Sequence, residues 1–201
     1  MMMAIAVIVA IGANAQNEEG VLTLMPKAGL NLATLTGDPD ASWRPSYVVG
    51  FEAEYGINEQ LGMVVGIQYS DQGCKNIDDA VPTPNEVKML FGYVNVPLMV
   101  QYYPVKGLAL KTGAQLGYLS SKKATIDGKR YDIDKLYAIT GTSSDFHSFD
   151  LSIPMGISYE YANFVIDARY NLGLFSIFKD ASNYKNSVFQ FTIGYKLPLR
   201  K

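Results

Sequence analysis

The chain has 201 residues, of which 48% are hydrophobic and 18% are charged, and its formal net charge is −2. Beyond the N-terminus it has no apolar run of about 18 residues, which excludes membrane-spanning helices, and its length suffices for one domain or one small barrel. The small net charge leaves no field to attract nucleic acid or anionic lipid.

The first segment of the chain reads as a secretory signal. Residues 4–11 form a short apolar core, and Ala13-Asn14-Ala15 matches the small-x-small cleavage pattern. No Lys or Arg precedes the core, which departs from the usual pattern. A membrane anchor is disfavoured because the run is too short to span a bilayer. We therefore predict a signal peptide over residues 1–15 and a barrel domain over residues 16–201.

Eight later segments alternate apolar and polar residues, and a period of two indicates β-strands. In one of them Tyr47, Phe51 and Tyr55 belong to an uncharged apolar face that lies opposite Glu52 and Glu54. Apolar rows of this length, with glycines and ions on the other face, are typical of a transmembrane β-barrel. The expected strands cover residues 24–33, 46–55, 61–71, 89–103, 108–119, 147–160, 163–174 and 187–197.

The connections between these strands alternate in length. Short turns are expected around residues 57–59, 104–107 and 161–162, and long polar loops at 34–45, 72–88, 120–146 and 175–186. This alternation predicts an all-β, eight-stranded antiparallel up-and-down transmembrane β-barrel in a bacterial outer membrane, surrounded by its lipids. The short turns and both termini then lie in the periplasm.

Tyrosines recur where the outward rows end. Every descending strand carries one near its periplasmic end, and two ascending strands carry one near their upper ends. Rings at these heights are expected to form two girdles at the lipid interfaces. A general preference of tyrosine for strands is the alternative. The expected girdle residues are Tyr55, Tyr69, Tyr102, Tyr118, Tyr159 and Tyr195.

The inward rows carry polar side chains of both charge signs. An eight-stranded barrel is just wide enough for its side chains to fill it, and buried ions need partners. We predict a salt-bridged plug in which Arg169 and Lys111 meet acids such as Glu52 and Asp167, with glycines such as Gly66 and Gly156 making room. The expected lumen network is Glu52, Glu54, Lys111, Asp150, Asp167, Arg169 and Lys196.

Three residues interrupt the pattern. Pro97 and Pro154 lie within expected strands, and because proline removes a ladder hydrogen bond, we expect a bulge or irregularity at each. Cys74 is the only cysteine, so an intramolecular disulfide is impossible. It falls in an expected loop, where its thiol is either incidental or available to another chain.

Motifs for catalysis are weak. His147 stands near Ser144, Asp145 and Ser148, but no second polar cluster marks an oxyanion site, so a solvated loop histidine is favoured over an acyl-transfer triad. Asp127, Asp132 and Asp134 do not have the spacing of an EF-hand loop, and Asp127-Gly128 suggests a hairpin turn. We expect no catalytic residues, no metal and no cofactor, and the chain has no basic or aromatic stripe for nucleic acid.

Several stretches resemble the PorT-type outer membrane β-barrel family of Bacteroidetes. The most specific is residues 169–174, Arg-Tyr-Asn-Leu-Gly-Leu, and residues 26–31, 93–98 and 113–119 also match. The resemblance covers essentially the whole mature chain and implies an eight-stranded barrel in the outer membrane. Some members of that family take part in protein secretion to the cell surface. Catalytic residues are not implied, because the family has no motif for them.

The leading interpretation is a non-enzymatic barrel, with a side-chain-filled lumen, that presents four extracellular loops for surface interaction. The alternatives are an accessory role in protein secretion, with a partner in the secretion machinery, a narrow solute channel, or a soluble lipocalin-like barrel with its apolar face inside. Loop 120–146 is the first candidate for contacts, although a merely solvated loop is equally expected. Its candidate residues are Lys122, Lys123, Lys129, Arg130, Tyr131 and Tyr137.

Overall fold

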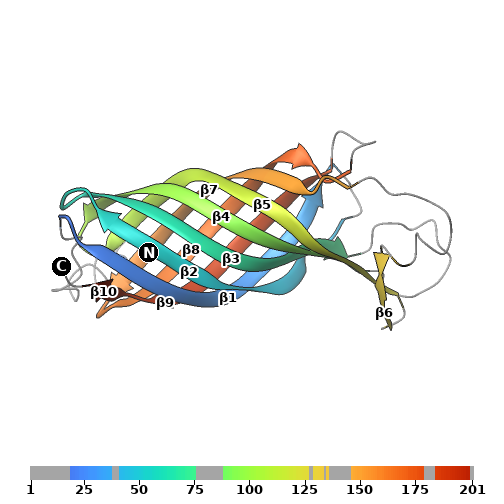
Figure 1. Ribbon diagram of the computed structural model, residues 1–201, viewed down its shortest axis with the longest axis horizontal. Coiled ribbons are helices and arrows are strands. Elements are labelled where there is room, and N and C mark those ends of the chain that lie inside the picture. Colours follow the sequence, from blue (N-terminus) through green and yellow to red (C-terminus); the bar gives the residue numbers. More distant parts are fainter. Residues whose placement is uncertain are drawn as a thin grey trace, which may run out of the picture.

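Eight long antiparallel strands close into a barrel (Figure 1). The computed structural model describes residues 19–37, 41–75, 88–126, 129–133, 135, 146–178 and 184–199. The strands are β1 (Leu22–Thr36), β2 (Arg44–Gly56), β3 (Leu61–Lys75), β4 (Lys88–Val105), β5 (Leu108–Ile126), β6 (Lys129–Asp132), β7 (Phe149–Tyr161), β8 (Phe164–Ser176), β9 (Lys185–Tyr195) and β10 (Leu197–Leu199).

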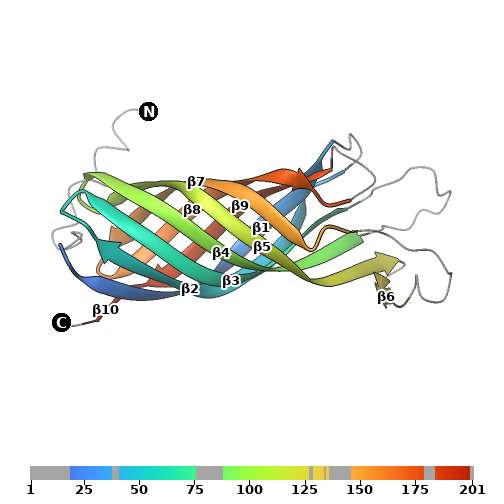
Figure 2. The same ribbon diagram turned by 45° about the horizontal axis from the view of Figure 1, so that its top comes forward.

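Each barrel strand pairs with the next, and β9 pairs back to β1, from Lys27 opposite Gly194 to Thr36 opposite Lys185. β10 continues that ladder in the same register after Lys196, whose backbone N–H donates to the Asn163 carbonyl at 2.8 Å. The closed, eight-stranded antiparallel barrel expected from the sequence is thereby confirmed (Figure 2). The last expected strand is divided between β9 and β10.

The two faces of the sheet have opposite character. Phe51 and Ile166 on the outer face are 52% and 61% exposed, whereas Gln68 and Glu52 on the inner face are each 1% exposed. A soluble barrel would bury its apolar face, so this arrangement rules out the lipocalin-like alternative. The outward rows therefore form the surface that a membrane would cover.

The connections differ between the two ends of the barrel. At one end, the short-turn end, β2–β3, β4–β5 and β7–β8 are joined by a few residues, and β1 begins and β10 ends there (Figure 1). Ala162 and Asn163 alone connect β7 to β8, with φ of 47° and 71°. The opposite, long-loop end carries the long connections and β6.

The third long connection contains more strand than the sequence predicted. Lys122 and Lys123 belong to β5, and Lys129 and Arg130 belong to β6, so the expectation that they lie in a loop was wrong. Ile126 pairs with Lys129 across two residues, as in a tight hairpin. Cross-strand pairing extends β5 past the barrel, and Figure 2 shows β5 and β6 projecting from the long-loop end. Tyr131 also lies in β6, while Asp127, Gly128 and Tyr137 lie outside the described residues.

Of the bulge or strand irregularity that the sequence predicted at each proline, the structure has no bulge but does have an irregularity in one ladder. Pro97 keeps its register with Gln115 of β5, and Pro154 keeps its register with Asn171 of β8. The other neighbour is β3 for Pro97 and β5 for Pro154. In each of these two ladders, two residue pairs are missing at the proline, and pairing then resumes in the same register. The reason is that a strand N–H points to one neighbour only, so its loss interrupts one ladder without shifting it.

Cys74 lies near the end of β3 and is fully buried, so the expectation that it sits in a loop was wrong. Of the two alternatives for its thiol, burial disfavours pairing with another chain. Gly73, with φ of 121°, precedes it, and a Cβ at Gly73 would stand 2.2 Å from the Met89 carbonyl oxygen. Glycine therefore permits a local kink in which Gln72, Gly73 and Cys74 are all buried.

Candidate functional site

An ionic layer of five side chains crosses the lumen toward the short-turn end. Arg169 of β8 lies at its centre, with Nε 2.7 Å from Asp167 Oδ1 and Nη1 2.9 Å from Glu52 Oε1. Lys111 Nζ of β5 stands 3.1 Å from Asp167 Oδ2, and Lys27 of β1 pairs with Glu52. The contacts of Arg169 and Lys111 with Glu52 and Asp167 are those named from the sequence, whereas the pair of Lys27 with Glu52 was not named. Each ion in the layer therefore has a partner of opposite sign, which offsets the cost of taking it out of water.

A second ionic group, the short-turn cluster, lies nearer the short-turn end. Lys196 Nζ stands 2.9 Å from Glu54 Oε2 and 2.6 Å from Glu160 Oε2. The Tyr103 hydroxyl donates to Glu54 Oε1 at 2.8 Å. Lys196 occupies the break between β9 and β10 and so ties the closing strand to β2 and β7.

The two groups balance each other in charge. The ionic layer holds three cations and two carboxylates, and the short-turn cluster holds one cation and two carboxylates, so together they hold four of each sign. Glu52 and Glu54 lie two residues apart on β2, which places the groups next to each other. An ion-selective pore is usually lined by one dominant sign, and this lumen has none.

Two glycines give the ionic layer its space. A Cβ at Gly156 would stand 2.7 Å from the Arg169 Cβ, and one at Gly66 would stand 2.8 Å from the Glu52 Cγ. Any larger residue at either position would displace a buried charged side chain. Gly113 is limited by the backbone instead, because its Cβ would stand 2.1 Å from the Leu98 carbonyl oxygen.

On the long-loop side of the ionic layer, inward amide side chains form a second layer, the amide layer. Gln68 Nε2 donates to Gln115 Oε1 at 3.1 Å and to Gln190 Oε1 at 3.3 Å, which joins β3, β5 and β9. Gln115 donates in turn to Ser152 Oγ at 3.2 Å, and Asn31 donates to Ser70 Oγ at 2.9 Å. Neutral hydrogen bonds thus replace ion pairs in the middle of the barrel.

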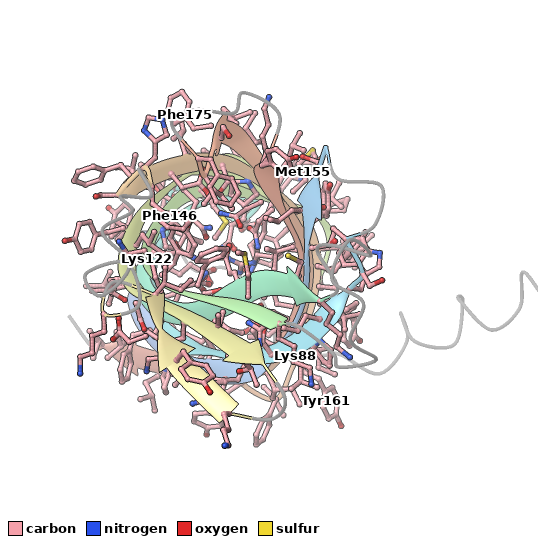
Figure 3. The ribbon with its side chains drawn as sticks, turned by 90° about the vertical axis from the view of Figure 1, so that its right-hand side faces the viewer. Lys88, Lys122, Phe146, Met155, Tyr161 and Phe175 are labelled. Carbon is pink, nitrogen blue, oxygen red and sulfur yellow. The ribbon has the colours of Figure 1, made fainter. Side chains whose placement is uncertain are left out.

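An apolar cap closes the lumen at the long-loop end. Phe91 and Phe146 lie 5.8 Å apart between ring centroids, and Phe146 pairs by an isolated bridge with Phe178. Lys122 Nζ lies 5.2 Å from the Phe146 ring centroid. Figure 3 looks along the barrel from this end and shows side chains filling the ring of strands, with Phe146 and Lys122 at one side of the ring. The buried members of the cap are Leu35, Cys74, Phe91, Tyr93, Leu119, Ala124, Ile133, Phe146 and Ile177.

The structure brings together six of the seven lumen residues named from the sequence. Glu52, Lys111, Asp167 and Arg169 lie in the ionic layer, and Glu54 and Lys196 lie in the short-turn cluster. Asp150 contacts neither group; it accepts a hydrogen bond from Asn186 Nδ2 at 3.0 Å. Tyr103 and Glu160 were missed, although both occupy inward positions of expected strands, so the same period would have found them.

All six tyrosines named for the girdles lie on outward rows. Tyr69 stands 5.9 Å from Tyr47, Tyr118 stands 5.5 Å from Phe149, and Tyr195 stands 5.0 Å from Phe164, measured between ring centroids. Sequence reasoning missed the non-tyrosine aromatics, because it followed tyrosine alone along rows that all aromatic residues share. Among the described residues, the exposed aromatics other than tyrosine are Trp43, Phe51, Phe149, Phe164, Phe175, Phe189 and Phe191.

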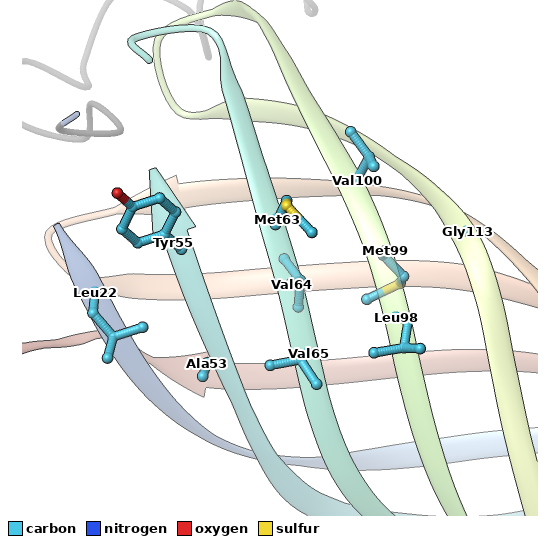
Figure 4. Close-up of a pocket in the computed structure, with 10 residues that line it drawn as sticks. All are labelled: Leu22, Ala53, Tyr55, Met63, Val64, Val65, Leu98, Met99, Val100 and Gly113. Atoms are coloured by element: carbon cyan, nitrogen blue, oxygen red, sulfur yellow. The ribbon is translucent and has the colours of Figure 1, made fainter. Parts of the chain in front are cut away.

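A shallow apolar groove lies on the outer face toward the short-turn end (Figure 4). Ala53 of β2 and Gly113 of β5 are its small lining residues, and Tyr55 lies at one edge. Its position on the outer face makes it part of the surface that lipid covers, rather than an entrance to the lumen. The lining residues are Leu22, Ala53, Tyr55, Met63, Val64, Val65, Leu98, Met99, Val100 and Gly113.

The features considered for catalysis do not assemble into a site within the described residues. His147 is exposed, and its backbone N–H donates to the Ile177 carbonyl at 2.8 Å. Ser144, Asp145, Asp127 and Asp134 lie outside the described residues. No group of three or more His, Cys, Asp or Glu side chains suited to a metal occurs in the described part of the chain. Among the same residues, helices of the length and apolar character that membrane crossing demands are absent.

Comparison with known proteins agrees with this architecture. The family model described as "Outer membrane protein beta-barrel domain" matches residues 14–179, most of the chain. No curated protein matches the chain.

Solved structures of several small barrels are similar. The attachment invasion locus protein Ail of Yersinia pestis is 16% identical over 89% of this chain and 99% of its own, with a TM-score of 0.50. Neisserial surface protein A is 16% identical over 89% of this chain and 100% of its own, with a TM-score of 0.48. OprG of Pseudomonas aeruginosa is 15% identical over 90% of this chain and 97% of its own, with a TM-score of 0.43. The likeness to Ail is one of fold.

Proposed function

The chain belongs to the outer membrane β-barrel domain family, and from that premise we propose that it is a non-enzymatic, plugged barrel whose activity resides at its long-loop end. The barrel lies in the outer membrane. The strands then anchor the protein in the membrane, and the long connections carry out recognition, because loops on a rigid scaffold commonly carry function.

The orientation follows the usual arrangement of such barrels, with short turns in the periplasm and long loops outside. The tyrosines at the ends of the outward rows then mark the two lipid interfaces, with Tyr55, Tyr102, Tyr159 and Tyr195 on the periplasmic side and Tyr69 and Tyr118 on the outer side. Their rings sit beside hydrocarbon and their hydroxyls reach water.

The observation that carries the proposal is the continuous filling of the lumen. The short-turn cluster, the ionic layer, the amide layer and the apolar cap follow one another along the barrel axis. Arg169, which contacts Glu52 and Asp167, lies across the middle of any axial path. A barrel filled in this way supplies an anchor, and a solute channel would require the ion pairs to separate.

Planar-bilayer recording tests the plug. We expect the wild-type protein to produce no regular single-channel steps at any applied voltage. A variant that carries both Arg169→Gly and Lys111→Gly lacks the centre of the ionic layer. If its strands still close into a barrel, we expect it to conduct ions. Regular, long-lived conductance steps in the wild-type protein would contradict the plug and favour the narrow solute channel.

The β5–β6 hairpin is the first candidate for the contact surface. Lys129, Arg130 and Tyr131 are exposed on β6, which projects beyond the barrel. Trypsin treatment of intact cells, followed by mass spectrometry of the released peptides, tests whether this hairpin faces outward. We expect cleavage after Lys129 or Arg130 and protection of Lys106, which lies in a short turn. Cleavage at Lys106 alone would reverse the proposed orientation.

A role in protein secretion is the second candidate, supported by the resemblance of residues 93–98, 113–119 and 169–174 to the PorT-type family of Bacteroidetes. In that case a protein of the secretion machinery is the partner. Deletion of the gene is expected to reduce the amount of protein delivered to the cell surface. A deletion strain with normal surface delivery would remove this candidate and leave the plugged anchor unaffected.

A further inference from the structure

Asp150 is a lumen carboxylate without a cationic partner among the described residues. Its Oδ2 accepts a hydrogen bond from Asn186 Nδ2 at 3.0 Å, while its buried Oδ1 has no hydrogen-bond partner. The other lumen carboxylates described above, by contrast, each contact Lys or Arg. A carboxylate oxygen that is buried without a counter-charge or a hydrogen bond is costly, so Oδ1 needs another source of compensation.

Polar side chains from neighbouring strands converge on the same place. Asn186 of β9 is 3% exposed and its Oδ1 has no partner. Asn95 of β4 is 2% exposed, and its Oδ1 lies beside Gly117. Gly117 of β5 pairs with both Asn95 and Asp150, and the space that its missing Cβ leaves is occupied in part by Asn95 Oδ1. A Cβ there would stand 2.8 Å from Asn95 Oδ1, 3.4 Å from the Asp150 Cβ and 3.4 Å from the Tyr93 ring.

We propose that Asp150, Asn186 and Asn95 form a binding site for a small monovalent cation such as Na⁺. Carboxylate and amide oxygens are the donors that hard cations prefer. A site with one carboxylate and neutral amides suits a single positive charge, whereas calcium sites commonly gather several carboxylates. Water alone would satisfy the hydrogen bonds but would leave the charge of Asp150 uncompensated.

The site is accessible from the long-loop end. Asp150 is the second residue of β7 and is partly exposed, so an ion reaches it without crossing the amide layer. Tyr93, a member of the apolar cap, forms one wall of the space at Gly117. The cation would therefore fix the strands beneath the cap, and its binding is expected to stabilise the folded barrel.

Thermal unfolding of the full chain in detergent tests the proposal. Melting is followed by circular dichroism in NaCl and in N-methyl-D-glucamine chloride at equal ionic strength, since the organic cation is too large for the site. We expect a Tm about 2–4 °C higher in NaCl, growing with concentration. Asp150→Asn removes the carboxylate charge and is expected to abolish the difference.

Two further variants separate cation binding from general effects. Asp71→Asn makes the same chemical change at the same end of the barrel, breaks the ion pair of Asp71 with Arg44, and is expected to keep the Na⁺ response. Gly117→Ala keeps every charge but fills the space, so it is expected to lose the response, and it decides the matter if Asp150→Asn does not fold. Equal melting of the wild-type protein in both salts, or an unchanged Na⁺ response in Asp150→Asn or Gly117→Ala, would overturn the proposal.

Discussion

The ionic layer and the apolar cap fill the same lumen by different means. In the ionic layer, the Arg169 guanidinium forms directional hydrogen bonds and ion pairs with Glu52 and Asp167. All side chains of this layer come from barrel strands. In the cap, Phe91 packs against Phe146, which comes from outside the barrel strands. Directional contacts therefore hold the barrel together toward its short-turn end, whereas non-directional packing ties a long connection to the opposite end.

The largest effect is expected from removing the centre of the ionic layer. Arg169→Met leaves Glu52 and Asp167 with fewer partners, so the free energy of unfolding should fall by about 3–5 kcal/mol. Urea titration of the protein in detergent micelles measures it. Arg169→Lys keeps the charge and should cost less, although it loses the forked geometry of the guanidinium. A loss below about 1 kcal/mol in Arg169→Met would show that the layer contributes little to stability.

A somewhat smaller effect is expected in the cap. Phe91 is 0% exposed, and Phe91→Ala should lower the free energy of unfolding by about 3 kcal/mol through lost burial and a residual cavity. Hydrogen exchange should show the loss confined to the residues around Phe146, leaving the ionic layer protected. Equal loss of protection around Arg169 would mean that the two regions unfold as one unit.

Crowding the ionic layer sharpens the comparison. Gly156→Ala places a Cβ 2.7 Å from the Arg169 Cβ, so the free energy of unfolding should fall by about 1–3 kcal/mol. Adding Arg169→Met to Gly156→Ala should give less than the sum of the two losses, because both changes act on the same side chain. Strict additivity in this double-mutant cycle would contradict the contact.

The smallest effect is expected far from both regions, in the turn between β7 and β8. Ala162 has φ of 47°, a conformation that glycine adopts without steric cost. Ala162→Gly should stabilise the barrel by about 0.5 kcal/mol, after allowing for the greater freedom of glycine in the unfolded chain. Urea titration measures the gain, and Ala53→Gly within β2 should instead destabilise.

The sequence was sufficient to predict the fold and the centre of the ionic layer, because a period of two assigns each residue of a strand to one face. The ion pair of Glu52 with Arg169 could be predicted because only a few charged residues occupy inward positions, which leaves each of them few candidate partners. The cap could not be predicted, since Phe146 lies outside any alternating segment and Cys74 follows a kink at Gly73. The extent of β5 and β6 was missed because polar residues such as Lys123 and Lys129 read as loop when cross-strand pairing is unknown.

The position of Lys196 bears on how the barrel enters its membrane. The carboxylates that it neutralises belong to β2 and β7, yet Lys196 lies in the closing strand of the barrel, between β9 and β10. Insertion one hairpin at a time would carry Glu54 and Glu160 into hydrocarbon before their counter-ion arrived. Membrane entry and closure are therefore expected to be a single concerted event, in which arrival of the C-terminal segment completes electrical neutrality.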